Sequence, residues 1–147
     1  MLTIEKKKTD IDPRVLSKME REPLILGWED RRRGRQRVRT LKGTEIALAL
    51  PTGTILKDGD VLFMDTRSYI AVEAAREEVI GIRPETIKEA AFWAYEIGNR
   101  HLPICIQEGM VLTPRDRALE QWLNREGITY RCLNEIFEPA RKAHDHG

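Results

Sequence analysis

The pattern of apolar residues changes at Ala75-Arg76-Glu77-Glu78, and this change constrains the fold more than any other feature of the chain. Before it, short runs of alternating apolar and polar residues are separated by turn residues, which is typical of an all-β unit. After it, signals for strands and helices alternate. We therefore expect an α+β protein with an N-terminal all-β domain over residues 1–75, a second domain over residues 76–138 and a loose tail over residues 139–147.

Five short apolar runs predict the strands of the first domain. They are Arg35 to Thr40, Glu45 to Leu50, Thr54 to Leu56, Val61 to Met64 and Tyr69 to Ala74. Asp58-Gly59 lies between the third and fourth runs, and both residues tolerate the positive φ angles of a type I′ turn. The sequence therefore predicts a hairpin at Asp58-Gly59.

The second domain combines strands with two helices. In chain order, the predicted elements are a strand over Glu78 to Ile82, a helix from Pro84 to about Ile97, a hairpin around Gln107-Glu108-Gly109, a helix that starts at Thr113-Pro114-Arg115-Asp116 and stops at Gly127, and a strand with Ile128, Tyr130 and Cys132. This order, βαββαβ, is that of the ferredoxin-like arrangement.

Residue types also predict where these helices end and which faces they bury. Pro84 suits a first helical turn, and Gly98 is the expected terminator because glycine readily takes the left-handed conformation. Thr113 is the expected N-cap of the second helix. The faces expected to pack on the sheet are Ile87, Ala90, Ala91 and Ala94 in the first helix and Leu119, Trp122 and Leu123 in the second.

Composition argues against several classes of protein. Hydrophobic residues at 41% suffice for a packed core, and the net charge of +1 gives no overall field to attract nucleic acid or an acidic membrane. No apolar run approaches the roughly 20 residues of a membrane-spanning helix, and the N-terminus does not resemble a signal peptide. Cys105 and Cys132 lie far apart in predicted strands, which indicates buried free thiols in a reducing compartment. We therefore expect a cytoplasmic protein that binds no membrane.

His101 is the only histidine outside the last four residues, and it lies just beyond the predicted end of a helix. One imidazole is a poor metal site, because transition metals require several donors at fixed geometry. A two-fold axis near His101 would bring two copies together, and the tail histidines His144 and His146 could then fold over the same ion. The alternative is that His101 only caps the helix, where the dipole favours a cation, and residue type alone favours that role.

Several segments, taken in order, resemble the UreE family of urease accessory nickel chaperones. They are Arg35 to Arg39, Ala47 to Pro51, Asp58 to Leu62, and Ala94 to His101 followed by Pro103. The resemblance implies a ferredoxin-like metal domain and a homodimer in which His101 binds Ni²⁺ between the protomers, with His144 and His146 helping to recruit the metal. It also implies two partners, an accessory GTPase that receives the nickel and the urease apoprotein complex, and a first domain similar to a peptide-binding module.

The residues alone do not select the metal. Zn²⁺ or Cu²⁺ could bind the same nitrogen donors, and Cu²⁺ should outcompete Ni²⁺ by the usual affinity order. An enzyme is not expected, because the chain has no nucleophile–base pair, P-loop or dinucleotide fingerprint.

The basic segment Arg31–Arg39 supports an alternative function. A strand places Arg35, Arg37 and Arg39 on one face, where they could bind the phosphates of a nucleic acid. The segment has no interleaved aromatic residues for base stacking, and the whole chain is nearly neutral. A solvated or protein-docking face, complementary to an acidic surface of a partner, is the better interpretation.

Overall fold

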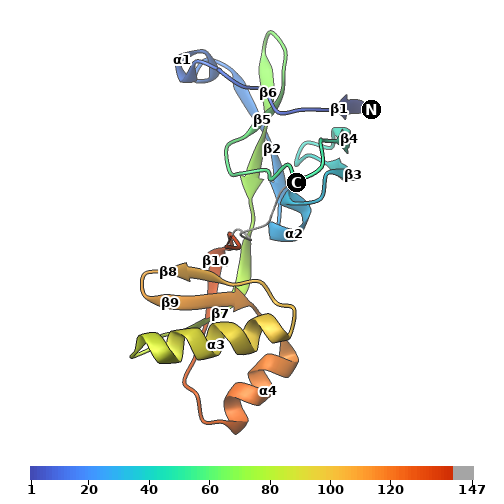
Figure 1. Ribbon diagram of the computed structural model, residues 1–147. Helices are drawn as coiled ribbons and strands as arrows, with labels where there is room; N and C mark the ends of the chain where they lie inside the picture. Colours follow the sequence, from blue (N-terminus) through green and yellow to red (C-terminus); the bar gives the residue numbers. More distant parts are fainter. Residues whose placement is uncertain (141–147) are drawn as a thin grey trace. The chain divides into compact units, whose positions relative to one another are not determined.

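The computed structural model describes residues 1–140, and the residue contacts divide the chain into two compact units (Figure 1). The first unit is Met1–Ala75 and the second begins at Arg76. Strands predominate in the first unit, and the second unit combines strands with two longer helices. The prediction of a mixed α+β protein is confirmed. Residues 141–147, which include His144 and His146, lie outside the described residues.

The first unit contains two three-stranded sheets. One has the order β1 (Leu2–Ile4), β4 (Glu45–Ala49), β3 (Arg35–Arg39), and the other has the order β2 (Glu20–Leu26), β6 (Ser68–Ala74), β5 (Val61–Met64). Alternation along β4 buries Ile46 and Leu48, which join Leu24, Leu62 and Val72 in one core. The unit also has two single-turn helices, α1 (Pro13–Leu16) and α2 (Trp28–Arg31), so the prediction of an all-β domain missed these turns.

The predicted hairpin at Asp58-Gly59 is wrong. Leu56 is fully buried but lies outside any strand, and only Gly59 of the two turn residues has a positive φ, at 90°. Side-chain carboxylates hold the turn instead. The carboxylate of Asp60 accepts from the backbone N–H of Lys57 at 2.7 Å, and that of Asp58 accepts from the N–H of Ala74 at 2.8 Å. The turn is therefore joined to β6, and β5 pairs with β6.

The second unit has the predicted element order βαββαβ. Its elements are β7 (Arg76–Ile82), α3 (Ile87–Asn99), β8 (Cys105–Gln107), β9 (Met110–Pro114), α4 (Arg117–Arg125) and β10 (Arg131–Ile136). The antiparallel sheet has the order β10-β7-β9-β8. Both helices pack on the same side of the sheet (Figure 1), because Ile80 and Ile82 of β7 share one core with Ile97 of α3 and Leu119 of α4.

Some turn predictions for the second unit are confirmed. Glu108 and Gly109 have φ angles of 52° and 76° and form the two-residue loop of the β8–β9 hairpin, as a type I′ turn requires. Leu119 and Leu123 of α4 are fully buried, and Gly127 follows the helix with a φ of 68°.

Other predictions for this unit are wrong. Thr86, and not Pro84, precedes the first residue of α3, and its hydroxyl accepts from the N–H of Glu89 at 3.1 Å. Asp116 caps α4, whereas Thr113 lies in β9, where its buried hydroxyl donates to the carbonyl of Pro103 at 2.8 Å. In both cases a competing capping residue lies closer to the apolar helical segment.

Two further properties of the whole described chain bear on the expectations from sequence. Cys105 and Cys132 lie in strands and form no disulfide, but Cys105 is only half-buried and Cys132 is exposed, so the prediction of buried thiols is wrong. Among residues 1–140, no helix is both long and apolar enough to cross a membrane.

Candidate metal centre

Helix α3 carries His101 at its end and has two apolar faces. Ile97 is fully buried, and Trp93 packs beside it on the core of the second unit. On the outer face, the residues Ile87 and Tyr95 are 90% and 65% exposed, and Phe92 is 50% exposed. The helix therefore buries one apolar face and leaves a second one in solvent.

The predicted core face of this helix is partly wrong. Ala90 and Ala94 are half-buried as predicted, whereas Ile87 and Ala91 are exposed. The helix begins later than predicted, and Trp93 with Ile97, four residues apart, takes the core face. A signal for the true start was present, because Thr86 and Glu89 have the spacing of a capping box.

A Schellman motif ends α3, and His101 occupies its left-handed position. The N–H of His101 donates to the carbonyl of Gly98 at 2.9 Å, and the N–H of Leu102 donates to the carbonyl of Ile97 at 3.4 Å. His101 has a φ of 61°, whereas Gly98 lies within the helix and has no positive φ. The predicted terminator Gly98 is therefore wrong, and the histidine itself turns the chain.

Helix α4 ends in the same motif with glycine in the equivalent position. The N–H groups of Gly127 and Ile128 donate to the carbonyls of Asn124 and Leu123, at 3.2 and 2.9 Å. Glycine takes the left-handed conformation without cost, whereas a side chain makes it unfavourable by about 1–2 kcal/mol. The use of histidine in α3 is therefore not explained by backbone preference.

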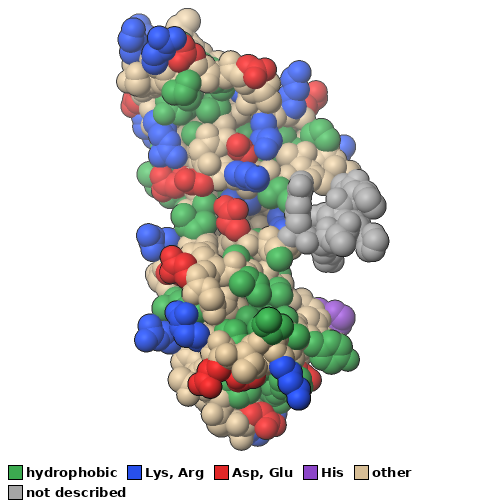
Figure 2. All heavy atoms as spheres, turned by 60° about the vertical axis from the view of Figure 1, so that its left-hand side comes forward, with side chains coloured by type: hydrophobic (Ala, Val, Ile, Leu, Met, Phe, Trp, Pro, Cys, Tyr) green, Lys and Arg blue, Asp and Glu red, His purple; other side chains and the backbone are tan. Residues whose placement is uncertain are grey.

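The motif directs the His101 side chain outward. Leu102, the next residue, packs on the core of the second unit, and the Arg100 guanidinium lies 5.5 Å from the centre of the Trp122 ring of α4. His101 between them is exposed. Figure 2 shows histidine atoms, which in the described chain belong to His101, at the surface beside hydrophobic side chains. The last carbonyls of the helix carry partial negative charge, which favours a cation there.

His101 is the only histidine among the residues that the structure describes. Among residues 1–140, no group of three histidine, cysteine or acidic side chains lies close enough to hold a metal ion. Burial, and secondarily the charge of Glu138, raises the pKa of the Cys105 thiol, which disfavours the thiolate that a metal would bind. The residues 1–140 therefore form no metal site of three or more such ligands around His101, and the predicted ligands His144 and His146 lie outside these residues.

The basic segment divides between the surface and the interior. Arg35, Arg37 and Arg39 are exposed on one face of β3, as predicted. Arg31 is buried, with 3% of its surface exposed, so it is not part of this basic face.

Two family models together match nearly the whole chain. The N-terminal domain of the UreE urease accessory protein matches residues 4–75, and its C-terminal domain matches residues 77–147.

Curated relatives agree with these models. The chain is 36% identical to a urease accessory protein UreE of Bacillus cereus over 76% of this chain and 74% of that protein. It is 34% identical to the urease accessory protein UreE of Burkholderia thailandensis over 100% of this chain and 70% of that protein. It is 36% identical to the one of Staphylococcus carnosus over 75% of this chain and 76% of that protein.

Proposed function

Because this chain belongs to the UreE family of urease accessory proteins, we propose that it is a homodimeric metallochaperone that captures Ni²⁺ at His101 and delivers it for assembly of the urease active site. Family membership makes it an accessory protein of urease maturation and not an enzyme. The nickel ion is its cargo.

The observation that carries the proposal is the position of His101 at the end of an exposed apolar helix face. Ile87, Ala91 and Tyr95 follow one another at four-residue intervals, so they form a stripe along α3, and His101 follows the C-terminal end of this helix. A soluble protein gains free energy by burying such a stripe. A two-fold axis beside it would cover the stripe with its own copy and bring the two His101 side chains together.

Paired imidazoles suit transfer better than storage. Two histidines leave coordination positions open on the ion, and a site with open positions can exchange its ligands. His144 and His146 would complete the shell during capture and withdraw during release. Imidazole binds a metal in its neutral form, so the affinity for Ni²⁺ falls on acidification. The accessory GTPase would then receive the ion in the cytoplasm and the urease apoprotein complex would incorporate it.

Calorimetric titration of Ni²⁺ into the wild-type protein, His101→Ala and a variant ending at Ala143 tests the metal site. We expect tight binding near one ion per dimer, loss of that binding in His101→Ala and weaker binding in the truncated variant. Zn²⁺ and Cu²⁺ should compete for the same site. Unchanged binding in His101→Ala would remove the basis of the proposal.

Light scattering tests the dimer separately. Tyr95→Asp places a charge on the exposed stripe and should shift the protein to the monomer, whereas Gln121→Asp adds the same charge on the exposed side of α4 and should leave the dimer intact. Equal masses for both variants would place the interface elsewhere.

A further inference from the structure

The outer face of the β1-β4-β3 sheet carries unpaired positive charge. Opposite Arg35, Arg37 and Arg39 of β3 lie Ala49, Ala47 and Glu45 of β4. Arg39 forms an ion pair with Glu45 at 2.5 Å. Arg35 and Arg37 face only alanines and have no acidic partner among the described residues.

The same strand is an edge of its sheet. β3 pairs with β4 alone. The N–H of Thr40 donates to Thr44 at 2.9 Å, and the N–H of Leu50 donates to Gly34 at 2.9 Å, so the even-numbered residues between them direct their backbone groups toward β4. The backbone N–H and C=O groups of the odd-numbered residues therefore face away from β4. Beyond the Arg39 end of β3, the N–H of Leu41 on this side already donates to the carbonyl of Pro23 of β2 at 3.0 Å. The free edge is therefore the part of β3 at Arg35 and Arg37.

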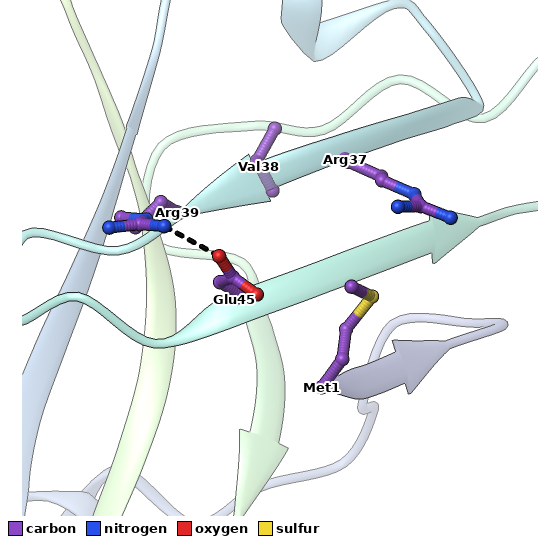
Figure 3. A pocket seen from close by; sticks show the side chains of 5 residues that line it. All are labelled: Met1, Arg37, Val38, Arg39 and Glu45. Atoms are coloured by element: carbon purple, nitrogen blue, oxygen red, sulfur yellow. Dashed lines mark hydrogen bonds and ion pairs between the residues drawn. The ribbon is translucent and has the colours of Figure 1, made fainter.

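A shallow depression lies on this sheet beside the arginines. It has a volume of about 240 Å³ and is lined by Met1, Arg37, Val38, Arg39 and Glu45 (Figure 3). Figure 3 shows the Arg37 guanidinium pointing away from the Arg39–Glu45 pair. Arg37 is therefore open to an incoming carboxylate.

We propose that the β3 edge binds an extended acidic segment of a partner protein as an added strand. Side chains on one face of a strand recur at every second residue, so an added strand with Asp or Glu at alternate positions would place its carboxylates opposite Arg35 and Arg37. Its backbone would pair with the outward N–H and C=O groups of the same residues. The inference does not depend on the metal site.

The local chemistry favours a protein segment over a nucleic acid. The residues around the depression include no aromatic side chain on which a base could stack, and an acidic residue, Glu45, stands among the arginines. A nucleic acid would also leave the edge backbone groups of β3 without partners. A peptide strand satisfies both the charges and the backbone.

The test uses two fluorescent peptides of about six residues, the usual length of a strand. One alternates Asp and Thr, and the other has the same residues with the aspartates adjacent. Fluorescence anisotropy measures their binding to the full-length protein, to Arg35→Gln/Arg37→Gln and to the control Arg117→Gln/Arg125→Gln, which removes the same charge from exposed positions of α4. A single-stranded oligonucleotide is titrated in parallel.

We expect the alternating peptide to bind more tightly than its isomer, with an affinity that falls as salt is added. The Arg35→Gln/Arg37→Gln variant should bind it roughly tenfold more weakly, and the control should bind it like wild type. Equal affinity for the two peptides, an equal loss in the control, or preferred binding of the oligonucleotide would each overturn the proposal.

A second pair of variants tests the backbone contribution. Arg37→Pro and Arg37→Gln remove the same charge, but only proline also removes the N–H that faces the free edge, a position where proline is tolerated. Arg37→Pro should bind the alternating peptide severalfold more weakly than Arg37→Gln, with thermal unfolding checked for both. Equal binding would exclude strand addition.

Discussion

Replacing His101 by glycine should remove the metal ligand and stabilise the fold at the same time. His101 occupies the left-handed position of the motif that ends α3, with a φ of 61°, and its backbone makes the bonds that define the motif. Glycine preserves those bonds and removes the steric cost of the side chain. The substitution should therefore weaken metal binding and raise the free energy of unfolding. If His101 were only a structural cap, its replacement would instead lower the free energy of unfolding.

The expected magnitude follows from two opposing terms. A side chain in the left-handed conformation costs about 1–2 kcal/mol, and the added freedom of glycine in the unfolded chain returns about 0.4–1 kcal/mol of this. The free energy of unfolding should therefore rise by about 0.5–1 kcal/mol in His101→Gly, whereas His101→Ala keeps the left-handed cost and should change little.

Gly127 provides the reverse experiment in the same unit. It has a φ of 68° in the equivalent motif of α4, and a Cβ placed there would meet no atom within 4 Å. Gly127→His should therefore lower the free energy of unfolding by about 0.5–1 kcal/mol through backbone conformation alone.

Urea unfolding followed by tryptophan fluorescence measures these changes. Trp93 and Trp122 both belong to the second unit, so a Trp28→Phe background makes the signal specific to it. A chelator removes the contribution of metal binding, and the same Tyr95→Asp substitution in every variant keeps the protein monomeric, so that dimerisation does not contribute. A His101→Gly protein less stable than wild type would refute the reasoning, because the imidazole would then stabilise the fold by more than its backbone conformation costs.

Three further predictions concern other parts of the chain. Hydrogen bonds, chiefly from the Thr40 hydroxyl, lower the pKa of Glu22. The ionised Glu22 therefore stabilises the fold fully above the ordinary pKa of a glutamate, and this stabilisation is lost as the pH falls through the lowered pKa. Thermal unfolding at several pH values should show a smaller loss of stability in acid for Glu22→Gln than for wild type. Iodoacetamide should label exposed Cys132 before half-buried Cys105, whose pKa is raised by burial, and peptide mass spectrometry with time would show the order. Asp116→Ala should lower the stability of the second unit by about 1 kcal/mol in urea unfolding, because the N-cap of α4 is lost; no change would mean that another residue caps the helix.

Local signals in the sequence predicted the features that depend on neighbouring residues. The βαββαβ order, the hairpin around Gln107-Glu108-Gly109 and the end of the second helix at Gly127 all follow from periodicity and turn chemistry within a few residues. Arg35, Arg37 and Arg39 lie on one exposed face of β3 because side chains at every second position of a strand point to the same side.

The parallel pairings of the first unit could not be predicted in this way. β1 pairs with β4 and β2 pairs with β6, and each pair joins segments more than forty residues apart in sequence. β2 also contains Pro23, which weakens the strand signal. The backbone N–H and C=O groups that join two strands are the same in every residue other than proline, so they do not encode which strands pair. The pairing of distant strands is set by how their side chains pack in the tertiary structure.

The sequence by itself determined that the chain has one internal histidine near a helix end and a face of alternating arginines. Only the tertiary structure decided that His101 would be the left-handed residue, that Trp93 and Ile97 would take the core face of α3, and that Tyr95 would remain exposed on its outer face. The reason is physical. A helix with apolar residues on several faces can pack by more than one of them, and the choice depends on which face best fills the space over the sheet.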